Sequence, residues 1–188
     1  MSEHVGKALV LGGVKSGKSR YAESLVQKVS TRVSVIVTAQ ALDDEMKRRI
    51  ARHQADRPNT WLVYEQPLML GQQLRDLAQG ESAAGTMAGA KTEVILIDCL
   101  TLWLSNLLML NDAAMMKAQV EDFVAAVKEC STPLVMVSNE TNMGIVPLGE
   151  VSRRYCDEVG LLHQRLATVC DRVDLLVAGL PLNVKPGS

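Results

Sequence analysis

The stretch Gly12-Gly-Val-Lys-Ser-Gly-Lys-Ser19 decides how the rest of this chain is interpreted. It matches the pattern of a phosphate-binding loop, in which a glycine and four further residues precede Gly-Lys-Ser. Because glycine lacks a Cβ atom, such a loop can turn sharply and point its N–H groups at anionic oxygens. Lys18 supplies a mobile positive charge for the outer phosphates, and the Ser19 hydroxyl is a suitable ligand for Mg²⁺. The alternative is a glycine-rich turn that binds nothing.

Two segments flank this loop as the phosphate-binding pattern requires. Residues 8–11 form a short apolar run typical of a buried strand, and residues 20–29 carry Tyr21, Leu25 and Val29 at helical spacing. The loop therefore joins a strand to the N-terminus of a helix, whose partial positive charge favours bound anions. This context favours phosphate binding over an empty turn.

Composition narrows the class of protein further. The chain has 188 residues and a formal net charge of −1, with a pI near 6.3, so no broad basic surface for nucleic acid is expected. Its hydrophobic fraction is 47%, yet no apolar run reaches the roughly 18 residues of a membrane span. Residues 1–7 lack the apolar core of a signal peptide. We therefore expect a cytoplasmic protein without membrane insertion, built as one domain over residues 1–188.

The cysteines are widely spaced and form neither a Cys-x-x-Cys pair nor a cluster with histidine. This spacing argues against a metal site made of thiolates, and we expect buried, reduced thiols instead. The four residues concerned are Cys99, Cys130, Cys156 and Cys170.

A β-branched run at residues 33–37 predicts a second strand, and Thr38, Ala39 and Gln40 follow where that strand opens into a loop. In open α/β sheets such strand ends line the ligand crevice. An ordinary turn with a capping threonine explains the same three residues.

Residues 43–56 predict a helix with an acidic first turn, which suits the helix dipole. Met46, Ile50 and His53 share one face of this helix, and Arg49 and Arg57 lie one turn to either side of the histidine. A histidine in such a place is often structural, and charged runs on helices are often solvated faces. In a chain that handles phosphate, the same cluster is also a candidate site.

Residues 93–97 predict a buried strand that ends in Asp98. An apolar strand ending in an acid, downstream of a phosphate-binding loop, is the second signature of a nucleotide site, because the carboxylate holds Mg²⁺ directly or through water. The alternative role for Asp98 is a helix cap, since a helical segment follows it.

The remaining segments continue an alternation of strands and helices. Residues 80–91 predict a surface loop, and the end of the chain predicts a short tail. Strands that alternate with helices favour an α/β fold with a mainly parallel, doubly wound sheet and helices on both faces. Besides the segments above, we expect strands at 61–64, 133–137 and 173–178, and helices at 68–77, 100–110, 113–130 and 151–170.

A polar loop at residues 138–147 follows one of these core strands. In a parallel sheet it emerges at the same edge as the phosphate-binding loop. Asn139, Glu140 and Asn142 are therefore candidates to meet a second substrate. A surface loop of turn-forming residues is the alternative.

Taken with these motifs, the chain resembles the bifunctional adenosylcobinamide kinase / adenosylcobinamide-phosphate guanylyltransferase family of cobalamin synthesis. The resemblance covers nearly the whole chain and implies a P-loop NTPase-like (RecA-like) fold. A phosphate-binding loop is common to very many enzymes, whereas the segments around His53 and at residues 139–147 are far more specific. The matching pieces are the loop at Gly12, Leu-Asp-Asp-Glu-Met at Leu42, Arg-Ile-Ala-Arg-His at Arg49, Arg-Pro at Arg57, Trp61, and Asn-Glu-Thr-Asn-Met-Gly-Ile-Val-Pro at Asn139.

The resemblance implies that the protein phosphorylates adenosylcobinamide with ATP or GTP. It would then transfer GMP from GTP to that phosphate, giving adenosylcobinamide-GDP and pyrophosphate. The family carries the guanylyl group on a histidine; His53 is the matching position, and Lys18 is the second catalytic residue. The resemblance also implies Mg²⁺ at Ser19 and Asp98, and a homotrimer with sites near subunit boundaries. The implied nucleotide contacts are Gly12, Gly13, Val14, Lys15, Ser16, Gly17, Lys18, Ser19, Thr38, Ala39, Gln40, Gln54, Ala55, Asp56, Arg57, Glu65 and Asp98.

The implied chemistry is physically consistent with these residues. A neutral imidazole can attack the α-phosphorus of GTP and so divide nucleotidyl transfer into two displacements. An unperturbed histidine, with a pKa near 6.5, is largely neutral at cytoplasmic pH. Arg49 and Arg57 would lower the pKa of His53 by like charge and would stabilise the transition state.

The chain departs from the family pattern at two places. Lys15 stands where the family usually has arginine, which keeps the charge but loses the bidentate geometry. The loop at residues 80–91 is longer than usual. Two rival functions are a plain small-molecule kinase, in which His53 is structural, and a regulatory nucleotide-binding module. Neither would form a covalent nucleotide adduct.

Overall fold

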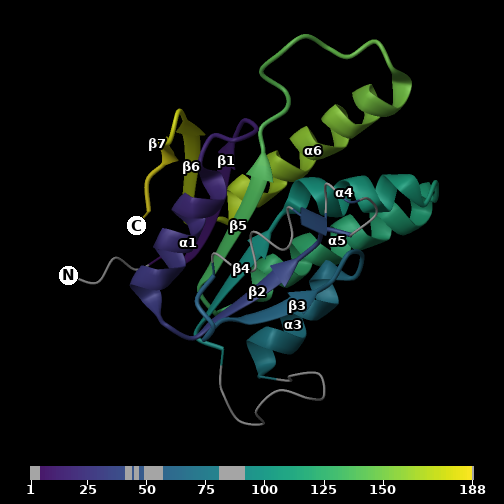
Figure 1. Cartoon of the computed structure of the whole chain (residues 1–188). Helices are drawn as coiled ribbons and strands as arrows, with labels where there is room; N and C mark the ends of the chain where they lie inside the picture. Colours follow the sequence, from purple (N-terminus) through teal and green to yellow (C-terminus); the bar gives the residue numbers. More distant parts are fainter. Residues whose placement is uncertain (1–4, 41–43, 45–46, 49–56, 81–91, 188) are drawn as a thin grey trace.

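The computed structural model describes residues 5–40, 44, 47–48, 57–80 and 92–187. A seven-stranded sheet with the order β3-β2-β4-β5-β1-β6-β7 forms its centre (Figure 1). The first six strands are parallel to one another, and β7 is antiparallel to β6. The predicted α/β class with a mainly parallel sheet is therefore confirmed. The strands are β1 (Lys7–Gly12), β2 (Val33–Val37), β3 (Leu62–Glu65), β4 (Val94–Asp98), β5 (Leu134–Asn139), β6 (Arg172–Val177) and β7 (Leu180–Lys185).

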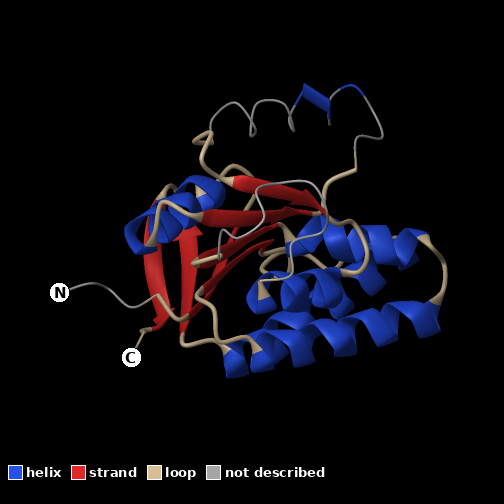
Figure 2. Ribbon diagram, turned by 90° about the horizontal axis from the view of Figure 1, so that it is seen from below, coloured by secondary structure: helices blue, strands red, loops and turns tan. Residues whose placement is uncertain are grey.

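Five helices lie within the described residues and cover both faces of this sheet. Strand residues alternate between the faces: Leu9 and Ile36 pack in one hydrophobic cluster with α3 to α6, while Val10 and Val35 pack in another against α1 (Figure 2). Parallel strands that are buried on both faces have continuous apolar sequences, and these runs are the pattern from which the strands were predicted. The helices are α1 (Lys18–Val29), α3 (Leu70–Gln79), α4 (Leu100–Met109), α5 (Ala113–Glu129) and α6 (Glu150–Val169).

Helix α4 is almost wholly apolar because its neighbours bury it. Trp103 has no exposed surface and meets Phe123 of α5 with ring centroids 5.0 Å apart at a tilt of 59°. Such a tilted aromatic pair contributes about 0.5–1.5 kcal/mol beyond its burial. The indole N–H of Trp103 also donates to the Leu68 carbonyl oxygen at 2.8 Å. These contacts hold α4, and with it the chain segment that directly follows Asp98.

Helix α3 begins two residues later than its apolar spacing predicted. The side-chain oxygen of Gln66 accepts hydrogen bonds from the backbone N–H groups of Leu68 (3.3 Å) and Met69 (2.9 Å). A side chain that satisfies N–H groups in this way holds the backbone in a turn. The helix therefore starts at Leu70.

The prediction of a short C-terminal tail is wrong, because residues 180–185 form strand β7. A tight turn at Ala178 (φ +52°) and Gly179 (φ +82°) reverses the chain, and β7 then pairs with β6. Pro181 within the strand and the exposed leucines on either side of it are unlike a core strand. Both features suit the edge position that β7 occupies, since proline cannot donate to a second neighbour.

Several predictions concern residues outside the described part of the chain. Of the predicted helix at residues 43–56, only Asp44, Lys47 and Arg48 are described, and all three are helical. Of the predicted loop at residues 80–91, only Gly80 belongs to the described part of the chain. None of the described helices has the length and hydropathy needed to cross a bilayer.

All four cysteines are free, as predicted, but only two of them are buried. Cys130 and Cys170 lie in the core, whereas Cys99 and Cys156 are partly exposed. Burial raises the pKa of the Cys170 thiol to about 12, so this group stays protonated at neutral pH.

Candidate active site

The carboxyl ends of four neighbouring strands bring most of the predicted site residues to one edge of the sheet. Strand β5 pairs in parallel with β1 and β4, and β4 pairs in parallel with β2. Gly12 at the end of β1 lies opposite Asn139, and Asp98 at the end of β4 lies opposite Val37 and Val137. The loop at residues 138–147 therefore leaves the sheet at the same edge as the phosphate-binding loop, as predicted.

The backbone of the phosphate-binding loop needs glycine at two points. A Cβ atom on Gly12 would lie 2.6 Å from the Ser16 hydroxyl and 2.7 Å from the Leu176 carbonyl oxygen. Gly17 has φ +92° and is the residue that precedes α1. Lys15 also adopts a positive φ of +56°, which is uncommon for a residue with a side chain. Close approach and left-handed backbone together give the loop the concave form that cradles anions.

Three polar side chains of the loop have the following surroundings. Lys18 is buried, and its ammonium group donates to the Gly13 carbonyl oxygen at 2.7 Å. Ser19 lies in the first turn of α1, at the positive end of the helix dipole. The Ser16 hydroxyl is buried and has no hydrogen-bond partner within the described residues. A buried hydroxyl without a partner is costly unless a bound group completes it, which fits a loop built for phosphate oxygens.

Two backbone contacts that support the loop were not predicted from the sequence. The N–H of Gly179, in the turn between β6 and β7, donates to the Ser16 carbonyl oxygen at 3.0 Å. The N–H of Glu140, at the end of β5, donates to the Gly12 carbonyl oxygen, also at 3.0 Å. Because β7 was missed, no sequence signal pointed to the first of these contacts.

Thr38 serves the structure of this edge rather than presenting a free hydroxyl. Its Oγ1 donates to the carbonyl oxygen of Cys99 at 2.6 Å and accepts from the N–H of Cys99 at 3.1 Å. The Thr38 side chain is fully buried, and its carbonyl oxygen accepts from the Asn106 side chain at 2.8 Å. Thr38 therefore ties the end of β2 to the start of α4.

Asp98 lies at the end of β4 and forms an ion pair with Arg57. The Nη2 atom of Arg57 lies 2.9 Å from Oδ2 of Asp98, and its Nε atom lies 3.5 Å from Oε1 of Glu23 on α1. The exposed fractions of these side chains are 4% for Arg57, 14% for Asp98 and 19% for Glu23. The guanidinium thus joins the segment after residue 56 to the sheet and to the first helix. It balances two carboxylates beside the phosphate-binding loop.

The oxygen atoms at this edge suit a hard cation more than a soft one. Ser19 offers a hydroxyl and Asp98 a carboxylate, and Mg²⁺ binds to one or two such groups together with water and substrate phosphates. No cluster of three or more histidine, cysteine, aspartate or glutamate side chains that would hold a metal occurs among the described residues. The hydroxyl of Ser19 and the carboxylate of Asp98 therefore fit Mg²⁺ that arrives with a nucleotide.

The other predicted contacts are placed as follows. Glu65 is exposed at the end of β3, opposite Val37 in the register of β2, and Ala39 and Gln40 are partly buried just after β2. His53, Gln54, Ala55 and Asp56 lie outside the described residues, so their predicted roles stay predictions.

A buried polar chain beneath the β5 loop was not predicted from the sequence. Nε2 of His163 on α6 lies 2.8 Å from the Ser138 hydroxyl, and Nδ1 lies 3.9 Å from a carboxylate oxygen of Glu140. Ser138 also lies 3.4 Å from the Thr101 hydroxyl, which accepts from the N–H of Asn139 at 2.7 Å. Burial lowers the pKa of His163, and the Glu140 carboxylate opposes this shift in part. The neutral ring therefore supports the chain where β5 becomes the loop.

A parallel strand, a glycine-rich loop and a helix that begins with Gly-Lys-Ser, next to an acid at the end of another strand, define a P-loop nucleotide-binding protein. The fold agrees with this class. The RadB recombinase, a solved structure, aligns with a TM-score of 0.50 at 11% identity and covers 91% of this chain and 74% of that chain. At this identity the likeness concerns the fold alone.

The sequence comparisons narrow the class to a family. Residues 8–184 match the family described as "Cobinamide kinase / cobinamide phosphate guanyltransferase", and the chain belongs to this family. It is 48% identical over 177 residues to "Bifunctional adenosylcobalamin biosynthesis protein CobP" of Pseudomonas aeruginosa, covering 94% of this chain and 96% of that protein. It is 35% identical over 190 residues to "Bifunctional adenosylcobalamin biosynthesis protein CobU" of Escherichia coli, covering 94% and 98%.

Membership of this family establishes the activity. The protein is a bifunctional cobinamide kinase and cobinamide phosphate guanylyltransferase of adenosylcobalamin biosynthesis, and it uses nucleotide and cobinamide substrates. The expected function is confirmed, and both rival functions, a kinase alone and a regulatory module, are excluded.

Proposed function

We propose that both reactions take place at the sheet edge described above, with the triphosphate of GTP or ATP held by the loop at residues 12–19. The observation that supports this most strongly is the form of the loop: Gly12 is closely packed, Lys18 is buried at the start of α1, and the Ser16 hydroxyl has no partner in the described chain. Lys18 neutralises charge that develops on the outer phosphates in both transfers.

Mg²⁺ enters this proposal with the nucleotide. Ser19 and Asp98 would hold it, and the ion would neutralise charge on the phosphates. In the structure Asp98 is paired with Arg57, so the arginine orients the carboxylate at the end of β4. The guanidinium also has a second carboxylate partner, Glu23.

His53 is the nucleophile of guanylyl transfer in this proposal. Its nitrogen forms a bond to the α-phosphorus of GTP while the bond to the pyrophosphate oxygen breaks, and the phosphate of cobinamide phosphate later takes the GMP group from the histidine. The support comes from Arg57, which follows His53 by four residues and is anchored at Asp98.

An experiment with labelled GTP tests this assignment. Label from α-labelled GTP is expected to stay on the denatured protein, and label from γ-labelled GTP is not. The bond should be labile in acid and stable in alkali, because protonation makes imidazole a good leaving group. In His53→Asn, which lacks a nucleophilic ring nitrogen, the adduct and GMP transfer should disappear while cobinamide phosphorylation persists.

His163→Asn is the matched control for this variant. His163 is buried against Ser138 on α6, so its replacement should leave the covalent adduct in place. Retained labelling in His53→Asn would assign the nucleophile to another residue. An unlabelled wild-type protein that still makes adenosylcobinamide-GDP would refute a covalent intermediate.

We further propose that the enzyme is a cytoplasmic homotrimer, with one domain per chain. The support is the resemblance to a family of trimers with sites near subunit boundaries. Sedimentation equilibrium should give three times the chain mass of 20.4 kDa. A mass equal to one or two chains would contradict the trimer.

A further inference from the structure

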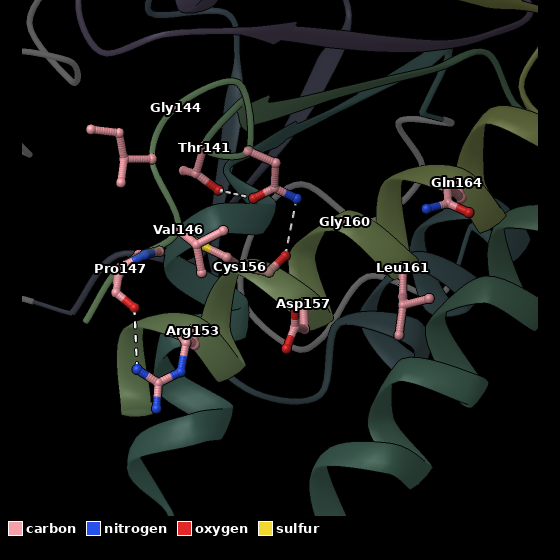
Figure 3. A pocket seen from close by; sticks show the side chains of 12 residues that line it. Thr141, Gly144, Val146, Pro147, Arg153, Cys156, Asp157, Gly160, Leu161 and Gln164 are labelled. Carbon is pink, nitrogen blue, oxygen red and sulfur yellow. Dashed lines mark hydrogen bonds between the residues drawn. The ribbon is translucent and has the colours of Figure 1, made fainter. Parts of the chain in front are cut away.

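A hollow of about 580 Å³ lies between the loop that follows β5 and helix α6 (Figure 3). We call it the α6 hollow. Residues of the loop form one wall, and one side of α6 forms the other. The volume lies within the range of about 300–1,000 Å³ that small-molecule sites usually have. The lining residues that matter here are Asn142, Ile145, Val146, Asp157, Leu161 and Gln164.

Specific contacts join the loop to the helix and so fix the two walls of the hollow. The Asn142 side chain donates to the Cys156 carbonyl oxygen at 3.0 Å, and a Cβ atom on Gly160 would lie only 2.5 Å from the same amide nitrogen. Glycine at position 160 therefore makes room for Asn142 on the helix. At the other end, Nη1 of Arg153 donates to the Pro147 carbonyl oxygen at 3.2 Å.

One end of the α6 hollow adjoins the phosphate-binding loop. The N–H of Glu140 donates to the Gly12 carbonyl oxygen at 3.0 Å, and the lining of the hollow begins at Thr141, the next residue. His163 and Ser138 support this junction from beneath. The hollow therefore begins next to the residue that contacts the phosphate-binding loop.

The lining of the hollow combines exposed apolar groups with polar groups that lack partners. Ile145 is 97% exposed, Val146 71% and Leu161 56%. The side chains of Asp157 and Gln164 line the same hollow (Figure 3), and within the described residues neither takes part in a hydrogen bond or ion pair. An amphipathic ligand that is broad, apolar on its faces and rich in amide groups at its rim would satisfy both kinds of group.

We propose that the α6 hollow binds the corrin ring of the cobinamide substrate. The ring has apolar faces that suit Ile145, Val146 and Leu161, and its carboxamide arms can donate to Asp157 and pair with Gln164. The hydroxyl-bearing arm then points along the loop toward Gly12, where the phosphates are held. This inference rests on the proposed function of the phosphate-binding loop and adds to it the site of the acceptor.

Steady-state kinetics of the whole enzyme test the proposal, with cobinamide varied at saturating GTP. Leu161→Glu places a charge on the apolar wall and should raise the KM for cobinamide at least about tenfold, equivalent to about 1.4 kcal/mol. Asp157→Asn keeps the shape of an exposed helix position and should raise the KM several-fold. The Kd for a fluorescent GTP analogue, measured without cobinamide, should stay within about twofold of wild type in both variants.

Leu182→Glu is the matched control, because Leu182 is 58% exposed but lies on β7, outside the lining of the hollow. Its KM for cobinamide should match wild type. The proposal is overturned if neither hollow variant changes that KM, if Leu182→Glu changes it equally, or if nucleotide affinity falls in parallel. Dissociation of the oligomer in Leu161→Glu would make the hollow a subunit contact and would overturn it as well. Lys18→Ala tests the phosphate-binding loop separately. Loss of GTP binding in that variant, with the cobinamide KM of the hollow variants still raised over wild type, would concern the loop and not the hollow.

Discussion

Replacing Arg57 by methionine tests whether the buried guanidinium balances Asp98 and Glu23. Methionine keeps most of the volume but removes the charge, and it leaves two carboxylates with exposed fractions of 14% and 19% next to each other. Breaking a buried ion pair from one side costs about 3–5 kcal/mol. For a chain of this length, the lower figure predicts a melting temperature reduced by about 6–12 °C. Urea denaturation monitored by circular dichroism should show the same loss in unfolding free energy.

Arg75→Met is the matched control for this experiment. Arg75 pairs with Asp122, but the two side chains are 27% and 36% exposed, and an exposed pair contributes at most about 1 kcal/mol. Adding Glu23→Gln to Arg57→Met should recover part of the lost stability, because it removes one of the two carboxylate charges that the guanidinium faced. If Arg57→Met loses no more stability than Arg75→Met, the guanidinium does not balance the two carboxylates and the reasoning fails.

Three further predictions concern the site and its support. Lys18→Ala should lower both the kinase and the guanylyltransferase rate on the order of 10²-fold; near-normal rates of both would refute the phosphate site. Asp98→Asn should lower the Mg²⁺-dependent turnover while the melting curve still shows a cooperative fold, and an unchanged rate with an unchanged Mg²⁺ requirement would leave Asp98 a structural residue. Burial lowers the pKa of His163 in the folded protein. The contribution of this group to the free energy of unfolding is therefore complete above the unfolded pKa near 6.5. It is lost as the pH falls from there toward the lowered folded value. His163→Asn should flatten this loss in a stability–pH profile, and a profile equal to wild type would contradict it.

The sheet and its helices were predictable because their signals are local. The apolar runs of β1, β2, β4 and β5 are buried on both faces, so each is continuous in the sequence. The order of the strands and the antiparallel pairing of β7 depend on contacts between distant segments. Pro181 and the exposed Leu180 and Leu182 gave β7 the composition of a tail, and only its pairing with β6 makes it a strand.

The candidate site was predictable in part for the same reason. The loop at residues 12–19 and the acid at the end of β4 are each recognisable from a few consecutive residues. The pairing of Arg57 with Asp98 spans 41 positions, and the contact between His163 and Ser138 spans 25, so no local pattern indicates either. At Thr38 a local pattern was present but did not indicate the observed contact. Its position at a strand end predicted a ligand contact, whereas its hydroxyl forms hydrogen bonds with the Cys99 backbone.

The contact between the Gly179 N–H and the Ser16 carbonyl oxygen has a consequence for the order of events during synthesis. Strand β1 lies inside the sheet, between β5 and β6, so neither of its neighbours exists when residues 7–19 leave the ribosome. Domains fold during synthesis at about 5–20 residues per second, and the turn at residues 178–179 follows the loop by some 160 positions. The hydrogen bond from Gly179 to the loop can therefore form only about 8–30 s after the loop has been synthesised. A nascent chain stopped before β6 should not retain nucleotide, whereas the released chain should.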